Sequence, residues 1–158
     1  RMINARAESV DEKPSFRQAF ASRRCLVCTD GFYEWKREGK SRLPFLMRRK
    51  TRKPIAFAGI WESFRSDEDE VVHTFASLTT EANGLMSPIH HRMPVIIEPD
   101  RYEQWLDPTL RTREALENLL VPAQEEGYEI FQVSEKVNSV ANDSEICLRP
   151  GPDQQRLF

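Results

Sequence analysis

The sequence predicts an α+β domain, on three observations. Runs rich in β-branched and aromatic residues, typical of strands, occur at residues 44–48, 55–64, 71–80, 95–97 and 128–133. Helical patterns with one apolar side are short and occur at residues 14–20, 99–106 and 109–120. The 158 residues, 39 % apolar and 30 % charged, suffice for one domain with a real core. We expect that domain over residues 1–150, with a C-terminal tail at 151–158 and fraying from Arg149 onward.

The opening residues 3–9 are predicted to form a strand with two contrasting faces. Asn4, Arg6 and Glu8 share one face, while small or apolar residues share the other. A face of amide, guanidinium and carboxylate groups is costly to bury without partners. It therefore belongs at an edge, in a polar network or in a site. The helix at 14–20 follows, with Phe16 and Phe20 on its buried side.

Residues 25–35, CLVCTDGFYEW, contain the first candidate for chemistry. Asp30 and Gly31 separate an apolar run from an aromatic run, which predicts a tight turn between two strands of a hairpin. Glu34 is then a carboxylate among aromatic rings, surroundings that suit a general acid or base. The alternative is an ordinary strand-edge glutamate with its carboxylate in water.

Residues 81–94, EANGLMSPIHHRMP, contain the second candidate. Several turn signals predict a loop, and loops placed by strands often carry catalytic residues. His90 or His91 would supply acid–base chemistry near neutral pH; the alternative is a pair of surface histidines. Metal binding is less favoured, because adjacent histidines point apart on an extended chain and no ligand cluster has suitable spacing. Neither a metal nor a cofactor is expected, and His73 is interpreted as structural.

The three cysteines, Cys25, Cys28 and Cys147, indicate a reducing compartment, and we expect a cytoplasmic protein. Cys25 and Cys28 lie in an apolar strand and are interpreted as core residues rather than as a redox or zinc pair. No apolar run approaches the roughly 20 residues of a membrane helix, so no membrane partner is expected.

The near-zero net charge of −2 hides a strong asymmetry. Residues 1–53 hold 15 Lys and Arg against 6 Asp and Glu, and the remainder is acidic. Within residues 36–53 nine basic residues accompany one acidic residue. Such a block indicates nucleic-acid binding, with a solvated face balanced by the acidic half as the alternative.

Three segments together resemble one known family. They are residues 3–9 (INARAES), residues 24–35 with the sequence DGFYEW at their end, and residues 89–94 (IHHRMP). In this order and spacing they are similar to the SRAP family, the SOS-response-associated peptidases. Val133-Ser134 and Val137-Asn138 also fit, and the resemblance covers residues 3 to about 150.

The resemblance implies a strongly bent mixed or antiparallel sheet, or a barrel-like core, with a few short helices. It also implies a cytoplasmic protein of the DNA damage (SOS) response that joins covalently to abasic sites in single-stranded DNA. In that family an N-terminal cysteine attacks the sugar aldehyde and closes a thiazolidine. By resemblance Asn4 holds the adduct, Glu34 is the catalytic acid or base, and His90 is the second proton-transfer group.

The expected DNA contacts combine resemblance and charge. By resemblance Arg6 contacts the DNA backbone. To it we add basic and aromatic residues placed to bind phosphates or stack on bases, namely Arg23, Arg24, Trp35, Lys36 and Arg92.

The sequence departs from the family in one respect, because no cysteine lies near its start. We therefore expect the larger C-terminal part of an SRAP domain, which carries proton-transfer and DNA-binding groups but cannot crosslink alone. Its sheet would lack partners, which favours dimerisation or strand exchange, and the oligomeric state stays open. Two alternatives remain: a cysteine peptidase, disfavoured by the apolar setting of Cys25 and Cys28, and a non-catalytic nucleic-acid-binding module.

Overall fold

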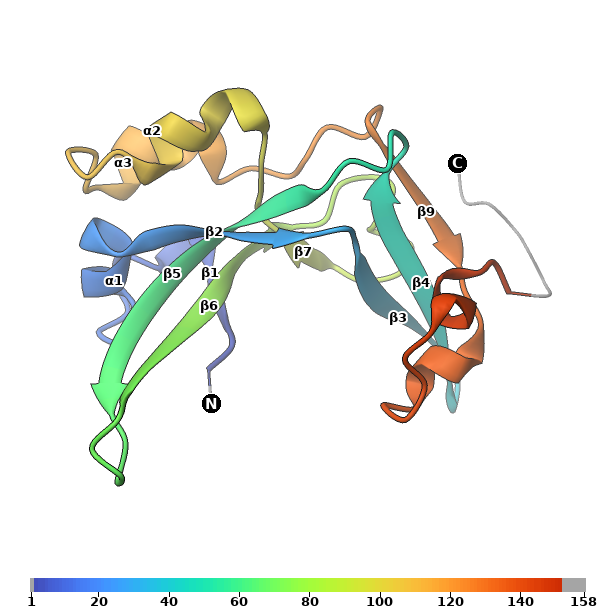
Figure 1. Ribbon diagram of the computed structural model, residues 1–158. Helices are drawn as coiled ribbons and strands as arrows, with labels where there is room; N and C mark the ends of the chain where they lie inside the picture. The colour runs from blue at the N-terminus through green and yellow to red at the C-terminus, as the bar shows by residue number, and fades with distance from the viewer. Residues whose placement is uncertain (1, 152–158) are drawn as a thin grey trace. The chain divides into compact units, whose positions relative to one another are not determined.

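The structure is a computed structural model that describes residues 2–151 (Figure 1). The strands are β1 (Asn4–Arg6), β2 (Arg24–Thr29), β3 (Phe32–Glu38), β4 (Ser41–Arg49), β5 (Ile55–Arg65), β6 (Val71–Glu81), β7 (Arg92–Pro94), β8 (Ile96–Ile97) and β9 (Tyr128–Gln132). The α-helices are α1 (Arg17–Ser22), α2 (Tyr102–Leu106) and α3 (Arg113–Leu116), and short 3-10 turns supplement them. The α+β class with few short helices is confirmed. Within residues 2–151 the strands form two sheets, and neither closes into a barrel.

The described chain divides into two compact units. The first comprises residues 2–28, 56–81 and 94–123, and the second comprises residues 29–55, 82–93 and 124–151. Each unit contains one sheet of its own, so each is described separately. The expectation of a single domain over 1–150 stays a prediction.

The sheet of the first unit has the order β1-β6-β5-β2, with β8 paired to β5. Strand β1 runs parallel to β6, while β5 and β6 form a long antiparallel hairpin. Its register continues through Gly59, which pairs with Ser77, so the glycine marks no bulge. Gly59 is instead required by close packing, because a Cβ there would lie 2.8 Å from both Cys25 Sγ and Val27 Cγ2.

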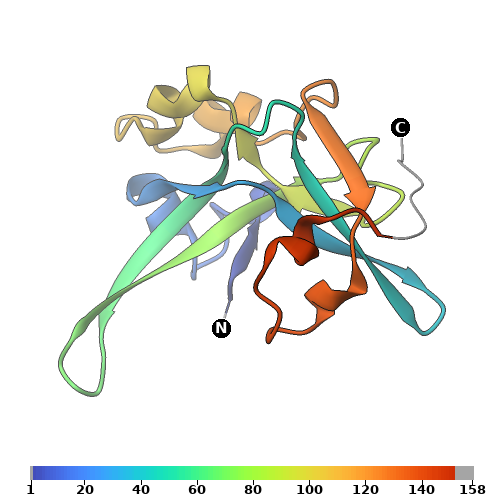
Figure 2. The same ribbon diagram turned by 45° about the vertical axis from the view of Figure 1, so that its right-hand side comes forward.

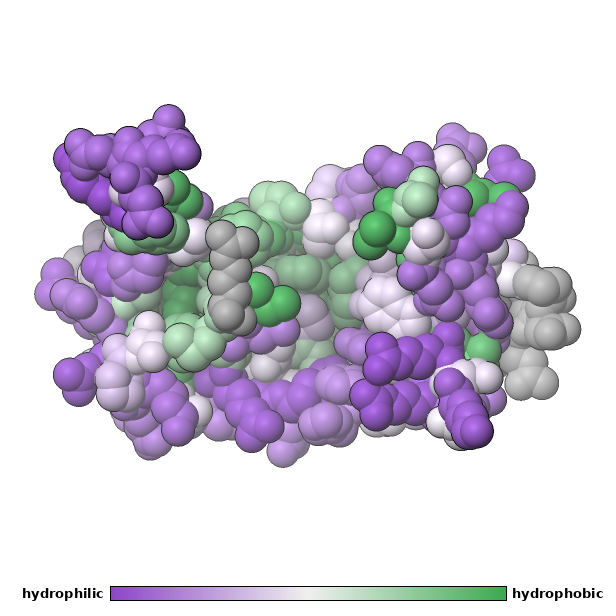
Figure 3. Space-filling model, turned by 90° about the horizontal axis from the view of Figure 1, so that it is seen from below, coloured by the Kyte–Doolittle hydropathy of each residue, from purple (hydrophilic) through white to green (hydrophobic). Residues whose placement is uncertain are grey.

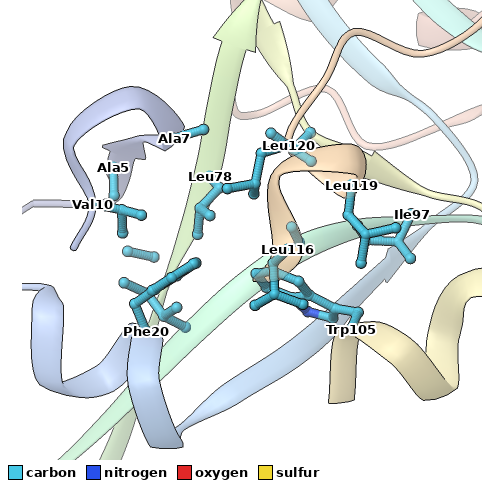
Figure 4. Close-up of a cluster of buried hydrophobic side chains, with 14 of the residues drawn as sticks. Ala5, Ala7, Val10, Phe20, Leu78, Ile97, Trp105, Leu116, Leu119 and Leu120 are labelled. Atoms are coloured by element: carbon cyan, nitrogen blue, oxygen red, sulfur yellow. The ribbon is translucent and has the colours of Figure 1, made fainter. Parts of the chain in front are cut away.

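The core of the first unit lies between this sheet and the short helices (Figure 4). Phe20 of α1 is fully buried, as its spacing from Phe16 predicts, and its ring lies 6.1 Å from that of Trp105. The indole of Trp105 donates to the carbonyl of Cys25 at 2.9 Å. The helix expected over 109–120 is shorter, because the Thr112 side chain caps α3 and a 3-10 turn follows it.

An apolar groove of about 850 Å³ runs along the β5–β6 hairpin of the first unit. Its lining includes Met2, Ile3, Phe16, Phe64 and Phe75. In Figure 3 hydrophobic surface gathers in this hollow, beside the hydrophilic loop that joins the two strands. Phe64 and Phe75 are 50 % and 57 % exposed, so this hairpin leaves large apolar side chains in solvent.

The sheet of the second unit is antiparallel, with the order β3-β4-β9. The β3–β4 hairpin turns at Gly39 and Lys40, and its tip projects in Figure 2. Gly39 has φ +60°, and Lys40 is not in the left-handed region, which matches a type II′ turn with glycine in first place. Leu46, Phe131 and Val133 form the core of this sheet.

The hairpin predicted around Asp30-Gly31 is wrong, because β2 and β3 belong to different sheets. Strand β3 pairs instead with β4, and most of the expected polar turn at 36–40 is strand. Gly31 permits that arrangement, because a Cβ there would lie 2.7 Å from the Met47 carbonyl oxygen. The chain thus passes from one sheet to the other at Asp30-Gly31, instead of turning back to pair with β2 in the same sheet.

The fraying expected from Arg149 onward is wrong for residues 149–151, which hydrogen-bond to residues 132–134. Pro150 forms a bridge with Val133, and the Gly151 N–H donates to the Gln132 carbonyl at 3.0 Å. The predicted C-terminal tail at 151–158 otherwise lies outside the described residues. Within residues 2–151 the helices are too short, or too polar, for a membrane crossing.

Candidate active site

Glu34 lies near the middle of β3, the outer strand in the order β3-β4-β9. Its carboxylate accepts the backbone N–H of Trp35 at 3.1 Å. The side chain is 27 % exposed, so the carboxylate is partly screened but reachable from solvent. An outer strand with a half-buried carboxylate gives a substrate room to approach.

His90 is held by a loop that hydrogen-bonds to itself, within the second unit. The Asn83 side chain accepts the N–H of Met86 at 3.0 Å, and the N–H of His90 donates to the Met86 carbonyl at 3.0 Å. The side chains of Met86 and Ile89 are buried and anchor the loop in the protein. The loop predicted over 81–94 is confirmed for residues 82–91, whereas residues 92–94 form the short strand β7. The internal bonds of this loop fix the position of the imidazole.

Glu34 and His90, far apart in the sequence, come together in this unit. His90 Nδ1 lies 4.0 Å from Glu34 Oε2, longer than a hydrogen bond but close enough for electrostatic attraction. The same Nδ1 lies 3.1 Å from the N–H and 3.0 Å from the carbonyl of Arg92. Neutral Nδ1 can therefore accept from Arg92, and protonated Nδ1 can donate to it. The site accommodates both protonation states, as a proton-transfer residue requires.

The two neighbouring histidines do not point apart. The ring centroids of His90 and His91 are 4.5 Å apart, with planes tilted by 41°. The extended-chain argument fails here because the turn at residues 84–90 bends the backbone before β7. His91 is exposed, whereas His90 Nδ1 approaches Glu34.

Trp35 and Tyr33 form an aromatic row on the opposite face of β3 from Glu34, with ring centroids 6.3 Å apart. The indole Nε1–H of Trp35 donates to Asn138 Oδ1 at 2.7 Å. The Tyr33 hydroxyl donates to the carbonyl of Cys147 at 3.2 Å, and burial, reinforced by Cys147 and opposed by Arg48, raises its pKa. Sequence reasoning missed the role of Asn138 as the residue that orients Trp35, although Val137-Asn138 fits the resemblance.

Asn4 and Arg6 belong to the first unit. Both lie in β1, opposite Ser77 and Thr79 of β6, and both are exposed. Ala5 between them is buried, so the predicted polar and small faces are confirmed over 4–6. Residues 7–9 form a 3-10 turn instead of continuing the strand. Neither side chain has a hydrogen-bond or ion-pair partner within residues 2–151.

The other residues predicted to contact DNA are engaged within the protein. Arg24 donates to the backbone carbonyls of Phe20, Trp105 and Asp107, and burial lowers its pKa despite the nearby Asp107 carboxylate. Arg23 pairs with Glu62. These two contacts with DNA stay predictions.

Lys36 and Arg92 lie in the second unit. The ammonium group of Lys36 lies 2.7 Å from a carboxylate oxygen of Glu38. Arg92 is half-buried in β7, and its backbone holds His90. Both contacts with DNA likewise stay predictions.

The cysteines give little support to nucleophilic catalysis. Burial raises the pKa of the Cys25 thiol, which disfavours the thiolate, and Cys147 is buried. Cys28 is exposed, so its interpretation as a core residue is wrong. The reason is strand geometry, because residues three apart lie on opposite faces.

Comparison with known proteins identifies the family to which the chain is similar. The family model "SOS response associated peptidase (SRAP)" matches residues 1–140. The chain is 41 % identical over 145 residues to the abasic site processing protein YoaM of Bacillus subtilis, covering 91 % of this chain and 64 % of YoaM. It is 32 % identical over 169 residues to the abasic site processing protein HMCES of Gallus gallus, covering 93 % and 49 %.

A solved structure is similar along nearly the whole chain. A crystal structure of a protein from Bacteroides thetaiotaomicron superposes with a TM-score of 0.84 at 33 % identity, covering 92 % of this chain and 65 % of that one. The chain thus spans somewhat less than two thirds of the length of YoaM and of this structural neighbour.

Proposed function

Since the chain belongs to the SOS response associated peptidase (SRAP) family, we propose that it takes part in the processing of abasic sites in single-stranded DNA during the DNA damage response. The observation that supports this most is the Glu34–His90 pair, in which His90 Nδ1 lies 4.0 Å from Glu34 Oε2 and has the N–H and the carbonyl of Arg92 as backbone partners. The names of the relatives supply the substrate class.

The proposed reaction is the formation of a thiazolidine between an N-terminal cysteine and the ring-opened sugar. The amine nitrogen adds to the aldehyde carbon, the resulting hydroxyl leaves as water, and the thiol sulfur adds to the iminium carbon. The sum is one water lost and two bonds formed to the same carbon. Each step moves a proton, which Glu34 and His90 would supply or remove.

Asn4 and Arg6 complete the proposal on the side of the substrate. The Asn4 amide can donate to one heteroatom of the adduct and accept from another, while Arg6 offers a planar fork to phosphate. The three cysteines of the chain are internal and have no α-amine. The proposal therefore assigns proton transfer and DNA contact, but not the nucleophile, to these residues.

A crosslinking assay tests the proposal. The protein purified from its own cells, with its N-terminus determined by intact mass, is incubated with single-stranded DNA bearing one abasic site and then denatured. We expect a shifted band whose mass equals protein plus DNA minus one water. Glu34→Gln should slow its formation by roughly 100-fold or more, the usual contribution of a general acid or base. Glu126→Gln, at an exposed position just before β9, is the matched control and should leave the rate unchanged.

Two results would contradict the proposal. A protein that begins with cysteine and gives no adduct would exclude thiazolidine formation. An adduct from a chain that begins at residue 1 would point to a lysine Schiff base instead. The non-catalytic binding module remains the second candidate, because the basic β3–β4 hairpin would bind DNA whether or not chemistry follows; it predicts salt-sensitive binding without any denaturant-resistant band.

A further inference from the structure

The tip of the β3–β4 hairpin carries three exposed cations, Arg37, Lys40 and Arg42. The register places Arg37 directly opposite Arg42, with Lys40 in the turn between them. Within residues 2–151 none of the three has an ion-pair or hydrogen-bond partner for its charged group. The nearest carboxylate along the strand, that of Glu38, is already 2.7 Å from Lys36.

Two arginines elsewhere in the same basic block, Arg48 and Arg52, are compensated. Arg48 lies 2.9 Å from Glu129 and stacks on the Phe131 ring at 4.5 Å. Arg52 reaches the same carboxylate at 3.6 Å. The two arginines of the tip therefore differ from Arg48 and Arg52, and the strand register places them directly opposite each other, unlike Lys50 and Lys53.

The arrangement at the tip costs stability. Residues directly opposite in an antiparallel pair have Cβ atoms about 5 Å apart, and like charges there destabilise the pair. Strand β3 could have relieved this cost with one acidic residue, as it does for Lys36 with Glu38. A tip that keeps two opposed guanidinium groups is suited to an anion from outside.

The tip also continues the aromatic row of β3. Alternate residues share a face, so Tyr33, Trp35 and Arg37 point to one side while Glu34 and Lys36 point to the other. The pair Trp35–Pro44 is followed on that face by the pair Arg37–Arg42, about 7 Å further along the strand. A stacking ring followed by cations on one face is the combination that single-stranded nucleic acids require.

We propose that Arg37 and Arg42, supported by Lys40, form a clamp for the backbone phosphates of single-stranded DNA next to a base on Trp35. This site rests on the proposed function for its substrate class. Guanidinium groups suit the task, because their planar donors match phosphate oxygens in pairs.

Binding of unmodified single-stranded oligothymidine across a salt series tests the clamp without any crosslinking chemistry. The variant carries Arg37→Ser and Arg42→Ser. The matched control carries Arg65→Ser and Arg101→Ser, which removes the same charge from exposed residues of the first unit. Because the tip variant no longer neutralises two phosphates, its slope of log K against log salt should fall in magnitude by about 1.4. The slope should fall by much less in the control.

Arg37→Glu gives an independent readout. The new carboxylate would face Arg42 across the strands, so we expect the melting temperature to rise by about 1 °C while DNA affinity falls. An unchanged salt slope in the tip variant, or an equal change in the control, would overturn the clamp. If the natural protein crosslinks abasic DNA but the slope does not change, the clamp is wrong and the proposed function stands. If the slope falls but no adduct forms, the clamp stands and the proposed function is wrong.

Discussion

The two long hairpins of the protein carry opposite charges at their tips, and their arginines differ in whether they are paired. The loop of β5–β6, residues 66–70, is acidic, and Arg65 reaches one of its carboxylates, that of Asp69, at 2.9 Å. Nearer the root of that hairpin, Arg23 pairs with Glu62. The tip of β3–β4 has three cations and no partner for them within residues 2–151.

The two hairpins also differ in how far their large apolar side chains are buried. Strand β4 buries Phe45, Leu46 and Met47, whereas β5–β6 leaves Phe64 and Phe75 half exposed beside an apolar groove. The β3–β4 hairpin therefore leaves cations without partners among the described residues, and the β5–β6 hairpin leaves apolar side chains exposed. Each of these features indicates the kind of ligand or surface that the hairpin can bind. The β3–β4 tip is suited to an anion, and the β5–β6 hairpin is suited to apolar contact.

The largest difference in stability between the hairpins should come from two tightly packed glycines, Gly31 just before β3 and Gly59 within β5. In Gly31→Ala the new Cβ would lie 2.7 Å from the Met47 carbonyl oxygen, so the backbone must move. In Gly59→Ala it would lie 2.8 Å from two side-chain atoms, Cys25 Sγ and Val27 Cγ2. Overpacking of this kind costs about 1–3 kcal/mol, and we expect Gly31→Ala at the upper end or above. Urea unfolding would measure both.

A rescue separates the two cases. Adding Cys25→Ala and Val27→Ala opens space for the Cβ at position 59, so part of the loss in Gly59→Ala should return relative to the same two substitutions in the wild-type background. No side-chain truncation removes the carbonyl of Met47, so Gly31→Ala should have no such rescue. If Gly31→Ala and Gly59→Ala lose the same free energy of unfolding and neither is rescued, the surroundings of the two glycines are equally rigid.

A smaller effect is expected at the turns. Gly39 has φ +60° in an open position, so Gly39→Ala should cost about 1 kcal/mol through backbone strain alone. Asp69 has φ 59° in the other loop, and Asp69→Gly relieves that strain but removes the contact with Arg65. We therefore expect Asp69→Gly to change the free energy of unfolding by less than about 0.5 kcal/mol. A Gly39→Ala variant as stable as the wild type would argue against the type II′ turn.

The hairpins also show what could be predicted from the sequence. The strand ranges followed from β-branched runs, and Glu34 from its aromatic neighbours, because both are local signals. The partner of Asp30-Gly31 was mispredicted, because a turn signal does not say which strands will pair. The clamp at Arg37 and Arg42 was not foreseen, because opposition depends on register.

In the candidate site, too, some features could be predicted from the sequence and others required the folded structure. His90 could be named from its sequence, but its approach to Glu34 and the two hydrogen-bonding groups of Arg92 depend on a folded loop. Asn138 could not be assigned to Trp35 without the structure. The roles proposed for Asn4, Glu34 and His90 rest on the family resemblance rather than on a local sequence signal.

The smallest prediction concerns the sign of a salt effect. Arg42→Gln removes a like-charge pair, so it should stabilise the protein by a few tenths of a kcal/mol at low salt. Arg65→Gln removes an exposed ion pair, so it should destabilise by a similar amount. Thermal melts at about 0.01 M and 1 M salt would measure both, since screening lengths fall from roughly 30 Å to 3 Å over that range.

The two effects should both fade at high salt while keeping opposite signs at low salt. That pattern follows only if Arg37 and Arg42 repel each other in solution as their register requires. If Arg42→Gln destabilises at low salt instead, Arg42 has a stabilising partner in the free protein. The cations at the β3–β4 tip would then be compensated like those of β5–β6, and the contrast between the hairpins would disappear.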